Sequence, residues 1–178
     1  MPWTQSGMQT NCRRTRNSLV FFASAGVWLV VDQLTKALAD TAVPGTLLWP
    51  GIRGVFDLYL VHNIGGAWGI FSGNTLAFGI FALIVCAAIL VIAHLRRSKA
   101  SGLEMFSLAL IFAGGAGNAI DRFVRGYVVD FFDFRLINYP VFNVADIGVV
   151  VGFILLLLVL VREYRVVDNA EGDSDNHH

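Results

Sequence analysis

Four aspartates in strongly apolar surroundings are the residues of this chain best suited to chemistry: Asp32, Asp121, Asp130 and Asp146. A carboxylate at the centre of a membrane-spanning helix costs about 2.5–3.5 kcal/mol on insertion scales, so its presence at that depth indicates a function. Two acids that share a poorly solvated pocket cannot both ionise; one keeps a proton and the other can act as a base. Asp130, within GYVVDFFDF, and Asp146, five residues into an apolar segment, best fit such a pair. Two acids that share one proton in this way can activate a water molecule and protonate a leaving amine.

The composition requires lipid as the solvent for most of the chain. Of 178 residues, 56% are hydrophobic and only 15% are charged, and 13 basic residues balance 13 acidic ones. These values exclude a disordered chain, an ordinary soluble domain and a nucleic-acid binder that relies on positive charge. Cys12 lies in a polar leader and Cys86 within an apolar run, so we expect no disulfide between them.

Four apolar segments are long enough to place helices across a bilayer, where about 20 residues span the hydrocarbon. The third has only 16 residues, so we expect its helix to extend back to Leu103 or forward through Asp121 and Arg122. The segments are Ser18–Ala39, Thr75–Ala93, Met105–Ile120 and Val141–Val161. The sequence therefore predicts an all-α membrane protein in which residues 18–167 form a single domain of four transmembrane helices.

The distribution of lysine and arginine predicts the orientation, because these residues are enriched in short cytoplasmic loops. Eight fall in the leader (1–17), in the turn at 94–102 and just after the fourth segment, against five on the other side. We therefore expect both termini to be cytoplasmic and the segments 40–74 and 123–140 to be extracytoplasmic. The first of these, with its valines, aromatic residues and glycines, is typical of one or two short strands. The polar, acidic tail at 168–178 is expected to be disordered.

Several polar residues have a structural explanation as well as a functional one. Asp32 and Lys36 are spaced i, i+4 and can pair on one helix face, and we expect that pair to be mainly structural. For Asn118, Asp121 and Arg122, ion pairing and substrate contact are equally supported. The run AGGAGN (113–118) favours close helix packing. No cysteine or histidine cluster has the spacing of a metal site, and His62 is expected to be a strand residue. Spacing alone leaves open a protease and a proton-coupled transporter.

Four blocks of sequence decide between them by resemblance. They occur in the order VVDQLTK (30–36), HNIGGAWG (62–69), GGAGNAIDRFVRGYVVDFFDF (114–134) and FNVADIG (142–148). In order and spacing these blocks resemble the bacterial lipoprotein signal peptidases, the signal peptidase II family. The resemblance assigns the catalytic aspartates to Asp130 and Asp146. It gives the substrate-binding or orienting positions to Asn63, Gly65, Asn118, Arg122 and Asn143, and structural support to Asp32, Lys36 and Asp121.

The resemblance also implies an activity and a setting. It implies an intramembrane aspartic endopeptidase of the inner membrane that cuts a prolipoprotein just before a cysteine carrying diacylglycerol. A small extracytoplasmic β-cradle (within 40–74) and a flap (131–140) would surround the site. It implies no metal or organic cofactor and no nucleic-acid partner, contact with membrane lipid, and inhibition by the cyclic peptide globomycin. We expect a monomer.

One departure from the family pattern concerns the edge of the pocket. Where the family commonly has NxGAAF, this chain has Gly66, Ala67 and Trp68 after the asparagine. A bulkier ring at Trp68 is expected to alter the pocket edge. A proton-coupled transporter would more often show repeated halves or broken helices, and a non-catalytic scaffold would not need paired acids and asparagines.

Overall fold

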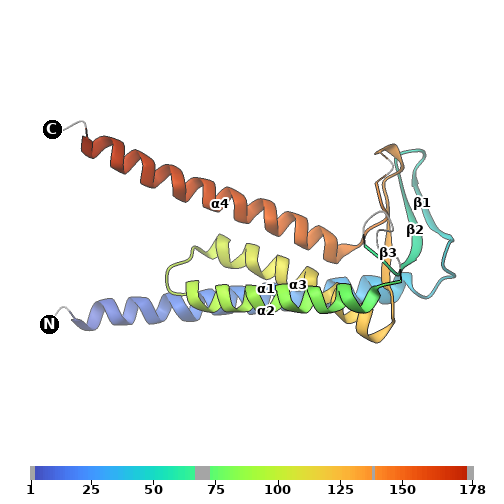
Figure 1. Cartoon of the computed structure of the whole chain (residues 1–178), viewed down its shortest axis with the longest axis horizontal. Helices are drawn as coiled ribbons and strands as arrows, with labels where there is room; N and C mark the ends of the chain where they lie inside the picture. The colour runs from blue at the N-terminus through green and yellow to red at the C-terminus, as the bar shows by residue number, and fades with distance from the viewer. Residues whose placement is uncertain (1–2, 67–72, 138, 176–178) are drawn as a thin grey trace.

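The computed structural model describes residues 3–66, 73–137 and 139–175. Four of its helices are long and apolar enough to cross a membrane. They are α1 (Trp3–Ala39), α2 (Thr75–Arg96), α3 (Gly102–Val124) and α4 (Val144–Asp175). Both chain ends lie at one end of the molecule, and a small sheet closes the other (Figure 1). This arrangement confirms the predicted fold of four helices with a small sheet.

The third helix shows how a short apolar run reaches spanning length. It begins at Gly102, where the Ser101 side chain accepts a hydrogen bond from the Glu104 backbone N–H at 3.0 Å. It continues to Val124 and so includes the polar residues Asp121 and Arg122, as the sequence predicted. α3 packs against each of the other three helices. Its polar end is therefore enclosed by the bundle and carries much of the site.

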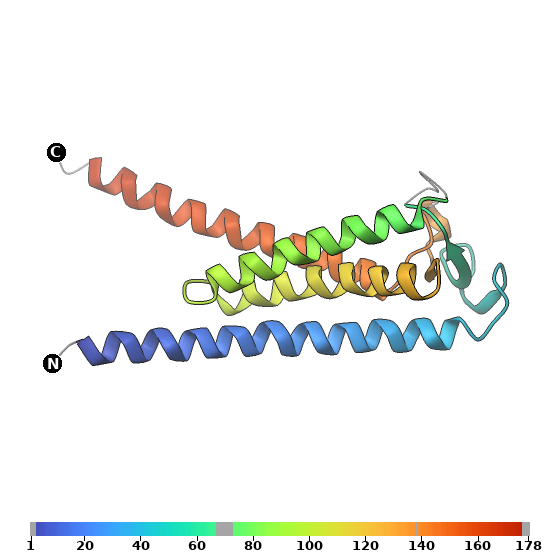
Figure 2. The ribbon, with the colours of Figure 1, turned by 60° about the horizontal axis from the view of Figure 1, so that its bottom comes forward.

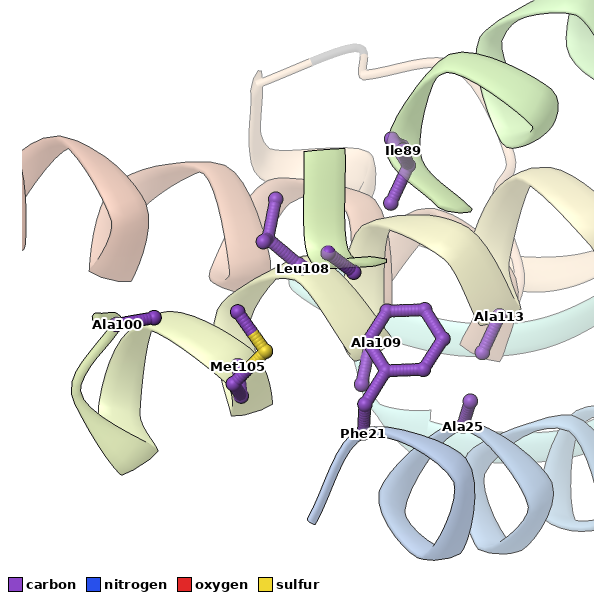
Figure 3. Close-up of a cluster of buried hydrophobic side chains, with 9 residues drawn as sticks. Phe21, Ala25, Ile89, Ala100, Met105, Leu108, Ala109 and Ala113 are labelled. Carbon is purple, nitrogen blue, oxygen red and sulfur yellow. The ribbon is translucent and has the colours of Figure 1, made fainter. Parts of the chain in front are cut away.

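Small residues permit this close packing. A side-chain carbon added at Gly114 would meet the Ala145 carbonyl and Val149 of α4, and one at Gly117 would meet the Asp32 carboxylate of α1. The AGGAGN run is therefore a packing face, as expected. Away from the sheet, Phe21 and Ala25 of α1 pack with Met105 and Ala109 of α3 in a buried apolar cluster (Figure 3).

The sheet is antiparallel, with the order β1 (Leu47–Ile52), β2 (Phe56–Asn63), β3 (Val128–Asp133). The one or two short strands expected within 40–74 are found as β1 and β2. In the β2–β3 ladder Val61 lies opposite Asp130, and Asn63 lies opposite Val128 at the end of the ladder. β3 follows α3 after a turn at Gly126, whose φ of 81° is the left-handed conformation that glycine adopts readily. The sheet thus brings β3 against the ends of the helices.

Three helix boundaries differ from the expectation. α4 begins at Val144 and not at Val141, because Asn143 caps it and leaves residues 141–142 outside the helix. α4 also continues to Asp175, through most of the segment for which composition predicted disorder, and α1 extends back through the leader to Trp3 (Figure 2). Each residue added to an existing helix gains a backbone hydrogen bond, whereas starting a helix is costly. The polar ends therefore extend helices that are already formed.

Candidate active site

Asp130 and Asp146 reach one cavity from different elements. Asp130 lies in the middle of β3 with 3% of its surface exposed. Asp146 is the third residue of α4. Both line a cavity of about 230 Å³, together with Asn63, Asn118 and Arg122. The structure therefore brings together residues that are separated by more than 80 positions in the chain.

A reciprocal capping interaction fixes Asp146. The Asn143 side-chain oxygen accepts a hydrogen bond from the Asp146 backbone N–H, and the Asp146 carboxylate accepts one from the Asn143 N–H, each at 3.1 Å. This is the arrangement of a capping box, in which the first and fourth residues satisfy one another's free N–H groups. The start of α4 consequently sets the direction of the Asp146 side chain.

The amide of Asn143 connects the two acids. Its Nδ2 donates to Asp130 Oδ1 at 2.7 Å, to Asn118 Oδ1 at 3.1 Å and to the Val129 carbonyl at 3.3 Å. Asn118 in turn donates from Nδ2 to Asp146 Oδ1 at 2.8 Å. Because Asn143 and Asn118 bind both carboxylates and each other, the two acids are held at a fixed separation across the cavity.

Asn63 and Arg122 complete the wall on the side of β2. Asn63 Nδ2 donates to Asp130 Oδ2 at 2.9 Å, and Asn63 Oδ1 accepts the Gly65 backbone N–H at 2.9 Å. Arg122 donates to the carbonyls of Gly65 and Asn118, each at 3.3 Å. Within the described residues its Nε is buried and has no acceptor. That N–H is available to a carbonyl of a bound peptide.

The surroundings of Asp130 favour its protonated form. Burial, and after it the nearby charge of Asp146, raise the pKa of Asp130 from 3.8 to about 7. Hydrogen bonds from Asn63 and Asn143 act in the opposite direction and limit the rise. Asp130 is therefore suited to keep a proton near neutral pH.

A buried ion cluster supports the site from behind. Lys36 Nζ lies 3.0 Å from Asp32 Oδ2, 2.8 Å from Asp121 Oδ2 and 2.9 Å from Asn118 Oδ1. The three charged side chains are fully buried. The same two carboxylates also hold the backbone next to the two acids: Asp32 accepts the N–H of Ala145 at 2.8 Å, and Asp121 accepts that of Val129 at 3.3 Å. Lys36 thus joins the two carboxylates that position the neighbours of Asp146 and Asp130.

The predicted site residues fall into two groups in the structure. The cavity and its hydrogen bonds bring together Asp130, Asp146, Asn63, Gly65, Asn118, Arg122 and Asn143. Asp32, Lys36 and Asp121 form the cluster behind it. Asp121 does not pair with its neighbour Arg122 but with Lys36 and Arg125, the latter at 2.9 Å. Trp68 lies outside the described residues, so its effect on the pocket edge stays a prediction.

Two residues that support the site were not predicted from the sequence. Gln33 donates to Asp32 at 3.1 Å and to Asp121 at 3.4 Å, so it links the two carboxylates that flank Lys36. Trp28 Nε1 donates to the Val144 carbonyl at 3.1 Å, at the start of α4. Gln33 lies within the block VVDQLTK, and its position next to Asp32 was the available signal. Trp28 carried no such signal, because apolar stretches commonly contain tryptophan.

Asp133 is placed away from the cavity. β3 is extended there, so side chains three positions apart, such as those of Asp130 and Asp133, point to opposite faces. Asp133 lies 3.2 Å from Arg135 Nε at the partly exposed edge of the sheet. We therefore expect Asp133→Asn to keep a substantial fraction of the catalytic activity, because the change affects a partly exposed ion pair outside the cavity. Initial rates of the variant and of the wild type on one substrate test this; an inactive but folded Asp133→Asn would show that the wrong acid was chosen.

Comparison with known proteins identifies the family of the chain. A model of a peptidase family described as signal peptidase (SPase) II matches residues 24–162. A lipoprotein signal peptidase of Clostridium acetobutylicum is 44% identical over 138 residues, which are 76% of this chain and 89% of the relative. One of Ralstonia nicotianae is 40% identical over 144 residues, or 78% and 82%.

Solved structures give the same answer for the fold. A bacterial membrane enzyme determined by the in meso method at 2.3 Å resolution has a TM-score of 0.72 and 31% identity, over 80% of this chain and 88% of that one. A second, at 1.9 Å, has a TM-score of 0.67 and 33% identity, over 78% and 90%. The four apolar helices and these relatives together define a multi-pass membrane peptidase of the aspartic class. The chain belongs to the signal peptidase II family.

Proposed function

We propose that this chain removes the signal peptide from prolipoproteins, cutting just before a cysteine that carries diacylglycerol, with Asp130 and Asp146 as the catalytic pair. The observation that carries this proposal is that one residue, Asn143, binds both carboxylates within one cavity: its side-chain amide donates to Asp130 and its backbone N–H donates to Asp146. The relatives named as lipoprotein signal peptidases supply the substrate class. Purified protein incubated with a lipidated prolipoprotein should release a smaller product, and globomycin should block the release.

The proposed mechanism needs one acid protonated and the other ionised, and we assign the proton to Asp130 because its pKa is raised to about 7. Asp146, ionised, takes a proton from a water molecule as its oxygen attacks the scissile carbonyl. Asp130, protonated, donates to the carbonyl oxygen, so that a neutral tetrahedral intermediate forms. The C–N bond then breaks, the departing nitrogen receives the proton held by Asp146, and the gem-diol returns a proton to Asp130. Water has been added across the amide, and the pair is again singly protonated.

The neighbouring polar groups orient the reactants. Asn118 and Asn143 fix the positions of the two carboxylates through hydrogen bonds. Arg122 would donate from its Nε, which has no acceptor within the described residues, to a backbone carbonyl of the substrate. Asn63 and Gly65 would lie beside the same backbone segment of the bound substrate. We further propose that the enzyme acts as a monomer.

The pH dependence of cleavage follows from the pKa of Asp130. Its pKa is raised to about 7, so below that pH it carries the proton that the mechanism needs, and above it the pair becomes doubly ionised. We expect kcat/KM to fall as the pH rises through about 7. Because one proton is lost, log(kcat/KM) should fall by about one for each pH unit above this value. Rates measured between pH 5 and pH 9 on one lipidated substrate test this; kcat/KM constant across pH 6–9 would contradict the assignment of Asp130 as the acid.

We further propose that the enzyme lies in the inner membrane, with cytoplasmic termini and an extracytoplasmic site. The excess of lysine and arginine in the leader, at 94–102 and after α4 supports this orientation. The placement of both chain ends opposite the sheet is compatible with it (Figure 1). Reporter fusions at Ser98 and Gly45 should report cytoplasmic and extracytoplasmic locations respectively. The same location for both fusions would contradict the orientation.

A further inference from the structure

A second polar cluster lies outside the cavity and is centred on Asp40, just after α1. His62 Nε2 lies 2.6 Å from Asp40 Oδ1, and because a carboxylate can only accept, Nε2 carries the hydrogen. The Tyr127 hydroxyl donates to Asp40 Oδ2 at 3.3 Å, and Arg125 Nε lies 3.8 Å from the same oxygen. The His62 and Tyr127 rings stack with centroids 3.7 Å apart. One carboxylate thus joins α1, β2 and the turn between α3 and β3.

The proposed chemistry does not use these residues, and their polar interactions are otherwise unexplained. Removal from water, and then the charge of Asp40, raise the pKa of Tyr127, so its hydroxyl stays a neutral donor. The exposed fractions are 26% for the His62 side chain and 18% for that of Asp40. The cluster is therefore only partly shielded, and an apolar packing role alone does not account for four polar groups at one point.

The position of His62 in β2 gives the cluster a consequence for the site. Side chains alternate along a strand, so His62 points to one face of the sheet and Asn63 to the other. Asp130 lies opposite Val61, which makes Asn63 its diagonal neighbour on the same face, within reach of its side chain. Asn63 is also the last residue of β2 and ends its ladder with β3. Strand ends open more readily than strand centres.

We infer that Asp40 and His62 are positioning residues: by anchoring the end of β2 to α1, they hold Asn63 in hydrogen-bonding contact with Asp130. This inference rests on the proposed function, because it concerns the catalytic acid. The hydrogen bond from Asn63 favours the ionised form of Asp130 and so limits the rise of its pKa. Loosening the end of β2 weakens that bond, and the pH above which cleavage declines then moves upward.

The test measures the pH above which cleavage declines, called the pH limit below, in three variants. His62→Phe keeps a ring that can stack on Tyr127 but loses the nitrogen that binds Asp40. We expect it to move the limit upward by about one unit, the size of one hydrogen bond to a charged group. Asn63→Ala removes the bond directly and should move it as far. If His62 acts through Asn63, the double variant should move it no further than Asn63→Ala alone.

Rescue and control variants separate positioning from a general loss of structure. His62→Gln can still donate to Asp40 and should keep the wild-type limit. Asp40→Asn keeps the volume of the side chain but removes its charge, and it should move the limit in the same direction by less, which provides a second route if His62→Phe does not fold. Asp57→Asn alters the ion pair with Arg135 at the other end of β2, where the two side chains lie 2.7 Å apart, and should leave the limit unchanged.

Two results would overturn the inference: a wild-type limit in both His62→Phe and Asp40→Asn, or a shift in the double variant equal to the sum of the two single shifts. Failure of the proposed function would look different. In that case the wild type would not cleave, or Asp130→Asn would cleave with an unchanged pH limit, whatever the His62 variants did.

Discussion

Asp130→Asn and Asp146→Asn should each reduce cleavage of a lipidated prolipoprotein below detection, by at least about 10³-fold. The reason is that one proton must be shared between two acids, and an amide can neither accept nor give it. Residues that act as a unit lose function non-additively, so the double variant should be no worse than either single variant. Initial rates at pH 6, compared with those of the wild type at equal protein concentration, test this.

The control for this prediction is binding. Asparagine has nearly the size of aspartate, and Asn143 and Asn118 can still contact it, so each variant should insert in the membrane and bind globomycin measurably. A variant that binds the inhibitor but does not cleave has lost chemistry and not its fold. Substantial turnover by either single variant would contradict the assignment of that residue to the pair.

Lys36→Met should have the largest effect on stability of any single substitution considered. Lys36 is the cation between two fully buried carboxylates, Asp32 and Asp121. Removing one partner of a buried ion pair costs about 3–5 kcal/mol, because it leaves uncompensated charge in a poorly solvated place. The free energy of unfolding in mixed micelles measures this cost.

Two further variants isolate its cause. Lys99→Met removes an exposed lysine from the turn between α2 and α3 and should change stability by less than about 0.5 kcal/mol. Adding Asp32→Asn and Asp121→Asn to Lys36→Met removes the unpaired charges and should recover part of the loss. If Lys36→Met were as stable as Lys99→Met, the cluster would not be what holds the backbone behind the two acids.

The sequence predicts the membrane helices well and also predicts that the two acids meet in one pocket, for physical reasons that are local. A run of about 20 apolar residues has few alternatives to a spanning helix, and acids such as Asp130 and Asp146 in apolar segments are rare enough to indicate function. The extended conformation around Asp130 was also predictable, from its β-branched and aromatic neighbours. The start of α4 was placed three residues early because hydropathy is insensitive to a cap such as Asn143.

The partners of the polar residues could not be predicted as well, because they depend on packing. Asp121 and Arg122 are adjacent in sequence, but successive residues of a helix point about 100° apart. Asp121 therefore faces Lys36 of α1 and Arg125, four residues on, while Arg122 faces the cavity. The contacts among Asp40, His62 and Tyr127 arise only when three elements meet, and no spacing in the sequence indicates them.

The mass of the cleavage products tests the central claim most directly. Wild-type protein and the double variant Asp130→Asn/Asp146→Asn are incubated with one lipidated prolipoprotein, and the products are measured by mass spectrometry. We predict that the wild type yields a product beginning at the lipid-modified cysteine, together with the intact signal peptide, and that the double variant yields neither. The same two products from the double variant, or a wild-type cut at any other bond, would contradict the assignment of Asp130 and Asp146 as the pair that performs this cleavage.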